Sequence, residues 1–123
     1  MTSSRSLGQE PLVIHVSGVR FLREQDGRPE RLLKGRLVES FKQGDEVQRA
    51  YLAQISSGEQ SGVALCLKTR HGPDPNVVRE VGSIFAGIFV KQEHLDILFL
   101  NENQESALRN VCAPFYAASA PAH

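Results

Sequence analysis

Residues 47–69 read VQRAYLAQISSGEQSGVALCLKT, and this stretch decides the fold. Its first part, 47–56, is strand-like, and its last part, 62–69, places three apolar side chains on one face of a strand: Val63, Leu65 and Leu67. The five residues between them, SGEQS, have the length and composition of a hairpin connection. The stretch therefore predicts a β-hairpin.

A helix is predicted on each side of this hairpin. Residues 30–43 carry apolar side chains at helical spacing: Leu33, Leu37, Val38 and Phe41. After the hairpin, Asp74 is placed to cap a second helix that has Pro75 at its first position. That helix has a wide apolar stripe, formed by Val77, Val78, Val81, Ile84, Phe85 and Ile88. Both helices therefore have a face to bury.

Two outer strands and a last helix complete the pattern. Residues 12–23 alternate as a strand whose phase shifts around Gly18, which indicates a bulge or bend. Residues 94–100, HLDILFL, read as a buried strand. A short helix follows, capped within residues 101–103, and it must end near Pro114.

The order of these elements, β-α-β-β-α-β, predicts an α+β fold of the ferredoxin-like kind. Such a fold has a four-stranded antiparallel sheet with both main helices on one face, here with an additional C-terminal helix. In this arrangement the strand at 12–23 lies between the strands at 62–69 and 94–100.

The predicted strands are apolar on both faces, and two helices on one side leave the second face bare. Either the C-terminal helix or a second copy of the protein covers that face, and the sequence leaves both alternatives open. We expect a protein partner or self-association through this face or through a free strand edge. The aromatic side chains expected at such an interaction surface are Tyr51, Phe115 and Tyr116.

Composition limits the classes of function. Basic and acidic residues number 14 each, and this zero net charge argues against a general binder of nucleic acid or of anionic membranes. A length of 123 residues indicates one domain, expected over 11–116, with flexible tails at 1–10 and 117–123. No stretch reads as a signal peptide or a membrane span, so we expect a cytoplasmic protein.

Few side chains point to catalysis. Cys112 is a candidate nucleophile, but its place near the C-terminal end of a helix disfavours a thiolate, and Cys66 reads as a packing residue. His94 and Asp96 share one face of their strand, where they could perform acid–base chemistry. Cysteines and histidines lack metal-ligand spacing, and the glycines form no phosphate-binding loop, so we expect no metal and no cofactor.

Several segments resemble a known family. The segments AYLAQI at 50–55, LDILFL at 95–100 and PFY at 114–116 are similar to the C-terminal domain of the enhanced serine sensitivity proteins of bacteria. The resemblance covers residues 29–116 and includes the apolar helix at 77–89. It implies no mechanism, and it supplies no catalytic residues.

Members of that family usually have a separate N-terminal domain. If that domain carries the activity, the resemblance implies that this chain is an interaction or regulatory unit. We therefore expect a non-catalytic binding or regulatory module. The alternative is an enzyme of small substrates that uses His94 with Asp96, or Cys112.

Overall fold

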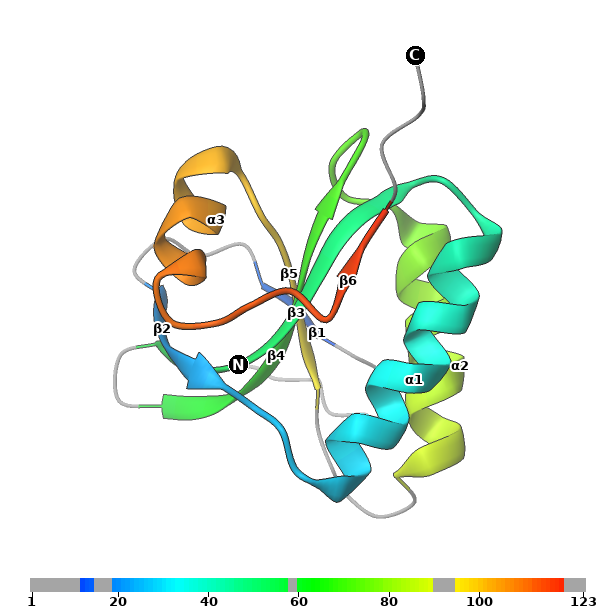
Figure 1. Cartoon of the computed structure of the whole chain (residues 1–123), viewed down its shortest axis with the longest axis horizontal. Coiled ribbons are helices and arrows are strands. Elements are labelled where there is room, and N and C mark those ends of the chain that lie inside the picture. Colours follow the sequence, from blue (N-terminus) through cyan, green and yellow to red (C-terminus); the bar gives the residue numbers. More distant parts are fainter. Residues whose placement is uncertain (1–11, 15–18, 58–59, 90–94, 119–123) are drawn as a thin grey trace, which may run out of the picture.

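The computed structural model describes residues 12–14, 19–57, 60–89 and 95–118. Within these residues, one sheet and three helices form an α+β architecture, as predicted (Figure 1). In chain order the elements are β1 (Leu12–Ile14), β2 (Val19–Glu24), α1 (Arg28–Gln43), β3 (Val47–Ser57), β4 (Gln60–Thr69), α2 (Pro75–Ile88), β5 (Asp96–Phe99), α3 (Glu102–Arg109) and β6 (Tyr116–Ala117). None of the three helices is long and apolar enough to cross a membrane.

The hairpin lies where the sequence predicts it, but its strands extend to Ser57 and Gln60, so the connection is shorter than the five residues predicted. α2 begins at Pro75 as predicted, whereas α1 begins at Arg28, two residues before the predicted range. β3 and β4 pair antiparallel, with Leu52 opposite Leu65. The side chain of Asp74 caps α2 by accepting a hydrogen bond from the Asn76 N–H at 2.9 Å. A carboxylate at this position satisfies one of the backbone N–H groups that the first turn of a helix leaves without a partner.

The order of the strands differs from the predicted ferredoxin-like order. The observed order is β1-β5-β4-β3-β2, so β4 pairs directly with β5. The predicted strand at 12–23 is two strands at opposite ends of this order, because β1 pairs with β5 whereas β2 pairs with β3. The pairs β1–β5 and β4–β5 are parallel, so the sheet is mixed. The predicted central position of the strand at 12–23, and the fully antiparallel sheet, are therefore wrong.

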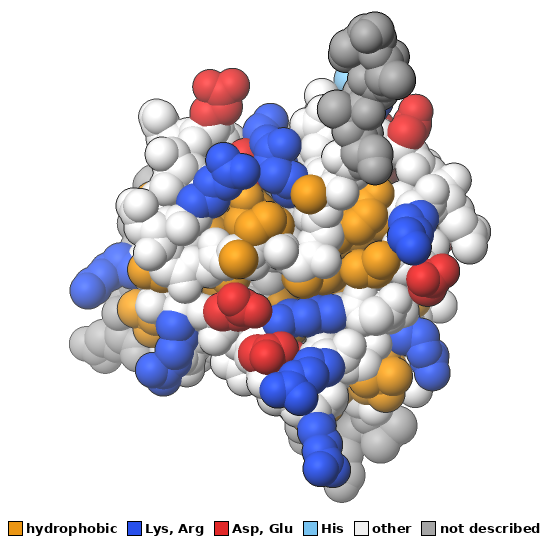
Figure 2. All heavy atoms as spheres, viewed as in Figure 1, with side chains coloured by type: hydrophobic (Ala, Val, Ile, Leu, Met, Phe, Trp, Pro, Cys, Tyr) orange, Lys and Arg blue, Asp and Glu red, His pale blue; other side chains and the backbone are white. Residues whose placement is uncertain are grey.

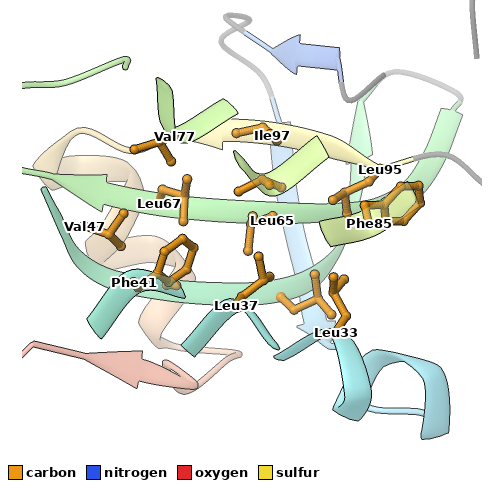
Figure 3. Close-up of a cluster of buried hydrophobic side chains, with 13 residues drawn as sticks. Leu33, Leu37, Phe41, Val47, Leu65, Leu67, Val77, Phe85, Leu95 and Ile97 are labelled. Carbon is orange, nitrogen blue, oxygen red and sulfur yellow. The ribbon is translucent and has the colours of Figure 1, made fainter. Parts of the chain in front are cut away.

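One face of the sheet is covered by α1 and α2, which build the main core (Figure 3). The side chains of Leu37 and Phe41 point from α1 toward Leu65 and Leu67 of β4. The buried residues of this core are Leu33, Leu37, Phe41, Val47, Ala50, Leu52, Leu65, Leu67, Val77, Val81, Phe85, Leu95 and Ile97. Burial of each large apolar side chain contributes about 1.5–3 kcal/mol, so this core is the main source of stability.

The opposite face of the sheet is covered by α3, which lies across the sheet from α1 and α2 (Figure 1). The second cluster of buried residues consists of Tyr51, Ala53, Ile55, Ala64, Cys66, Leu98, Leu100, Leu108 and Cys112. The sequence left open whether the C-terminal helix or a second copy of the protein covers this face. In the structure the C-terminal helix, α3, packs here.

The outer edge of β3 is shared by two short strands. β2 pairs with residues 53–57 of β3, and β6 pairs with Arg49 and Ala50. Backbone N–H groups of Gln25, Phe115 and Ala118 donate to the carbonyl oxygens of Leu52, Ala50 and Gln48, respectively. This edge is therefore bonded within the chain, and its hydrogen bonds extend to Ala118.

Candidate functional site

The cysteine thiols lie in the second cluster, between the sheet and α3. Cys112 is 5% exposed, and its Sγ lies 3.7 Å from the carbonyl oxygen of Leu52. Burial raises the pKa of the Cys112 thiol to about 11, and burial also raises the pKa of Cys66. A thiol with a raised pKa is a poor nucleophile near neutral pH because the thiolate is the reactive form. Both cysteines therefore serve as packing residues in this cluster.

The predicted acid–base pair is only partly within the structure. Asp96 begins β5 and is half-buried, and it lies opposite Ala64 of β4 and Leu12 of β1. His94 lies outside the described residues. The arrangement of this pair consequently stays a prediction.

Of the three predicted interface aromatics, Tyr51 is fully buried under α3. Its hydroxyl donates to Glu105 Oε2 at 2.6 Å, and Glu105 also accepts from Arg49 Nη2 at 2.9 Å and from Arg49 Nε. The ion pair with Arg49 lowers the pKa of Glu105 to about 2, and burial raises the pKa of Tyr51 to about 12. Tyr51 therefore anchors α3 to the sheet and has no exposed surface to offer a partner.

Phe115 and Tyr116 are half-buried and close the open side of the main core next to α1. The Nζ of Lys34 lies 5.9 Å from the centre of the Phe115 ring. The Tyr116 ring packs on Phe41 with 5.6 Å between ring centres, and its hydroxyl makes a long hydrogen bond of 3.5 Å to the carbonyl oxygen of Phe41. Figure 2 shows hydrophobic side chains gathered in the middle of the face of the molecule on which β6 lies, with charged side chains around them.

A cavity of about 420 Å³ lies between the end of α1 and the start of α2. In Figure 1, α1 ends and α2 begins at the same end of the helical layer. The apolar part of the cavity wall is formed by Phe41, Val47 and Val77, which also belong to the main core. Since Tyr116 packs on Phe41, the C-terminal strand supports this wall from behind.

The polar part of the wall is rich in carboxylates: Asp45, Glu46, Asp74 and Glu80. Two of them are engaged, because Asp74 caps α2 and Glu46 accepts from the N–H and Nδ1 of His71. Within the described part of the chain, the carboxylates of Asp45 and Glu80 have no hydrogen bond or ion pair. The cavity therefore presents two carboxylates that are free to meet a ligand.

Sequence reasoning missed this cavity. Asp45 follows the first helix and Glu80 lies in the second, and each alone reads as an ordinary solvated surface residue. The only available signal was the pair of helix boundaries, the end of the first helix at residue 43 and the cap of the second at Asp74, which were predicted correctly. Nothing local in the sequence indicates that these two boundaries lie side by side.

Comparison with known protein families gave a match over most of the chain. The family described as SseB protein C-terminal domain matches residues 19–117, a range that contains the entire cavity wall. Neither the curated proteins nor the solved structures gave a match.

Proposed function

The chain belongs to the SseB protein C-terminal domain family, as its sequence predicted, and from this membership we propose that it is a non-catalytic binding module. The family is not a known enzyme family. The module binds its partner at the cavity between α1 and α2, and the partner is a segment of another protein.

The observation that carries this proposal is the cavity itself. Its wall consists mainly of exposed polar groups, with Phe41, Val47 and Val77 of the main core at its base, and a concave surface of this kind is where a binding site is expected. The wall is built on regular elements, because Val47 begins β3, Val77 is in the first turn of α2, and the Phe41 ring packs against Tyr116. A rigid site loses little conformational entropy when a partner binds.

The position of the reactive candidates supports binding over catalysis. Cys112 lies on the face of the sheet opposite the cavity, in the cluster under α3. The described side chains in the cavity wall include carboxylates and amides but neither a cysteine nor a histidine. The alternative is an enzyme that uses His94 with Asp96, and Asp96, the described residue of that pair, is not among the residues of this wall.

A variant that blocks the cavity tests the proposal. Gly44 contributes to the wall, its backbone is extended, and a Cβ added there meets no atom within 4 Å. Gly44→Phe therefore adds bulk beside the wall, and its Cβ displaces no neighbouring atom. Gly35→Phe is the matched control, because Gly35 is exposed on α1, outside the cavity wall, and has the same free space.

The measurement is selection of a displayed random peptide library on the immobilised, full-length chain. We expect the wild type and Gly35→Phe to enrich the same peptides and Gly44→Phe to lose them. Enrichment that is identical on all three proteins, or no enrichment on any, would overturn the proposal.

A further inference from the structure

We infer that the edge of β3 at residues 48–50 is an interaction surface for an extended segment of another protein. In the structure the chain's own segment 113–118, which we call the strap, occupies this edge. The partner segment pairs with the same edge and carries adjacent aromatic side chains, as the strap does with Phe115 and Tyr116. The inference does not depend on the proposed function, which concerns the cavity between α1 and α2.

The strap adds to a sheet that is complete without it. β6, its paired part, lies off the path β1-β5-β4-β3-β2 and pairs with Arg49 and Ala50 of β3. Figure 1 shows β6 between β3 and α1, after a connection from α3 that is neither helix nor strand. No described element follows β6, so its release would leave the other five strands and the three helices in place.

The contacts that hold the strap are few. The N–H of Phe115 donates to the carbonyl oxygen of Ala50 at 2.9 Å. The N–H of Ala118 donates to the carbonyl oxygen of Gln48 at 2.8 Å. Both aromatic residues of the strap are only half-buried, and the hydrogen bond of the Tyr116 hydroxyl is long, at 3.5 Å. Segments with few buried contacts open locally at a much lower free energy than the core, so we expect the strap to leave this edge while the domain stays folded.

The surface beneath the strap is held in place by other contacts. β3 pairs with β4 from Val47 to Ser57, so its edge remains extended when the strap leaves. Lys34 of α1 has a side chain that is 12% exposed, and its Nζ lies 2.9 Å from Asp26 and 3.3 Å from Glu24. A preformed surface of this kind loses little conformational entropy when a segment docks on it.

The strap shows which chemistry this surface accepts. Backbone pairing with an open strand edge requires only an extended segment, whereas side-chain contacts give the selectivity. Both rings of the strap pack against the main core. Lys34 Nζ lies over the Phe115 ring, 5.9 Å from its centre, and the centre of the Tyr116 ring lies 5.6 Å from that of Phe41. An ammonium group attracts the face of an aromatic ring, and a ring favours a second ring, so the surface selects a segment with two adjacent aromatic side chains.

The probe is a fluorescein-labelled peptide with the sequence of the strap, APFYAA, added to the full-length chain. In the wild type the strap competes with this peptide at an effective concentration on the order of millimolar. Phe115→Ala with Tyr116→Ala removes both rings from the strap, so this variant should bind the peptide at least about tenfold more tightly by fluorescence anisotropy. The matched control, Leu22→Ala with Leu32→Ala, removes two exposed apolar side chains outside the strap and should bind as the wild type does.

The register of the strap gives a second pair of probes. A peptide methylated on the backbone nitrogen at the position of Ala118 cannot donate to the carbonyl oxygen of Gln48, and it should bind at least about tenfold more weakly. Methylation at the position of Ala117 is the control and should be tolerated, because successive N–H groups of a strand point to opposite edges. Equal effects of the two methyl groups would overturn the inference.

Hydrogen exchange of the wild type tests the strap without any substitution. An excess of unlabelled peptide should hold the strap away from β3, so the Phe115 and Ala118 amides should exchange at least about fivefold faster while the amides between β3 and β4 stay protected. Unchanged exchange at these two amides would overturn the inference, and so would equal peptide affinity of the wild type and the double variant. A mass that rises with concentration in the wild type but not in the double variant would also overturn it, because the occupant would then be the strap of a second copy.

Discussion

Arg49 on β3 and Glu105 on α3 form a two-point ion pair across the second face of the sheet, and the Tyr51 hydroxyl bonds to the same carboxylate. The Glu105 side chain is 7% exposed and that of Arg49 is 32% exposed. α3 has eight residues, too few to be stable alone, so these contacts and the burial of Leu108 hold it in place. The polar network thus joins the last helix to the sheet.

The first prediction concerns this network. Glu105→Ala leaves the buried Tyr51 hydroxyl and the partly buried Arg49 without their acceptor, so we expect a loss of about 2–4 kcal/mol in the free energy of unfolding. Glu102→Ala, at an exposed position of the same helix, is the control and should change stability by less than about 0.5 kcal/mol. Urea denaturation measures both. Equal effects for the two variants would show that the ion pair contributes nothing.

The second prediction follows from the lowered pKa of Glu105, which is about 2 in the folded chain against an ordinary value of 4.5. Because the unfolded chain takes up this proton first as the pH falls, the contribution of Glu105 is present above about pH 4.5 and is lost as the pH falls towards about 2. The stability difference between wild type and Glu105→Gln should therefore shrink over this range. A difference that stays constant between about pH 6 and pH 2.5, measured by urea denaturation, contradicts the assignment.

The third prediction separates a packing role of the cysteines from a catalytic one. Cys66 and Cys112 are buried under α3 and have raised pKa values, so a thiol reagent should modify the native chain at least about a hundredfold more slowly than the unfolded chain. Glu105→Ala should speed the reaction, since it weakens the attachment of α3. Rapid modification of native Cys112 would instead favour the enzyme alternative.

The sequence predicted the elements that depend on local chemistry. The structure confirms the alternation of Val63, Leu65 and Leu67 and the apolar stripe around Val81. It also confirms a helix cap at Asp74 and another within residues 101–103, at Asn101. Asn101 and Gln104 form the reciprocal pair of hydrogen bonds that defines the start of α3.

Strand order and the site depend on contacts between distant residues, and no local pattern encodes them. The apolar alternation of residues 12–23 is the same whether both halves pair in the centre of a sheet or at its two ends. Glu105 reads as a solvated residue of a polar helix until Arg49 and Tyr51 are brought beneath it. Asp45 and Glu80 line the same cavity only because α1 and α2 pack together.

The last prediction concerns self-association, which the sequence suggested through the second sheet face or a free edge. α3 covers the second face, and β2 with β6 occupies the outer edge of β3. The outermost strand on that side, β2, carries the exposed charges of Arg20, Arg23 and Glu24 and an irregular register after Phe21, which are features that oppose edge pairing.

The exposed apolar side chains on the described surface are few, with Leu22 40% exposed, Leu32 49% and Val111 39%. A small number of exposed apolar side chains is normal on a monomer. We therefore expect a monomer, with a mass near 13.6 kDa at micromolar concentration in sedimentation equilibrium. A mass that rises towards twice this value with concentration contradicts the prediction, and Leu22→Lys with Val111→Lys would then show whether these two side chains form the interface.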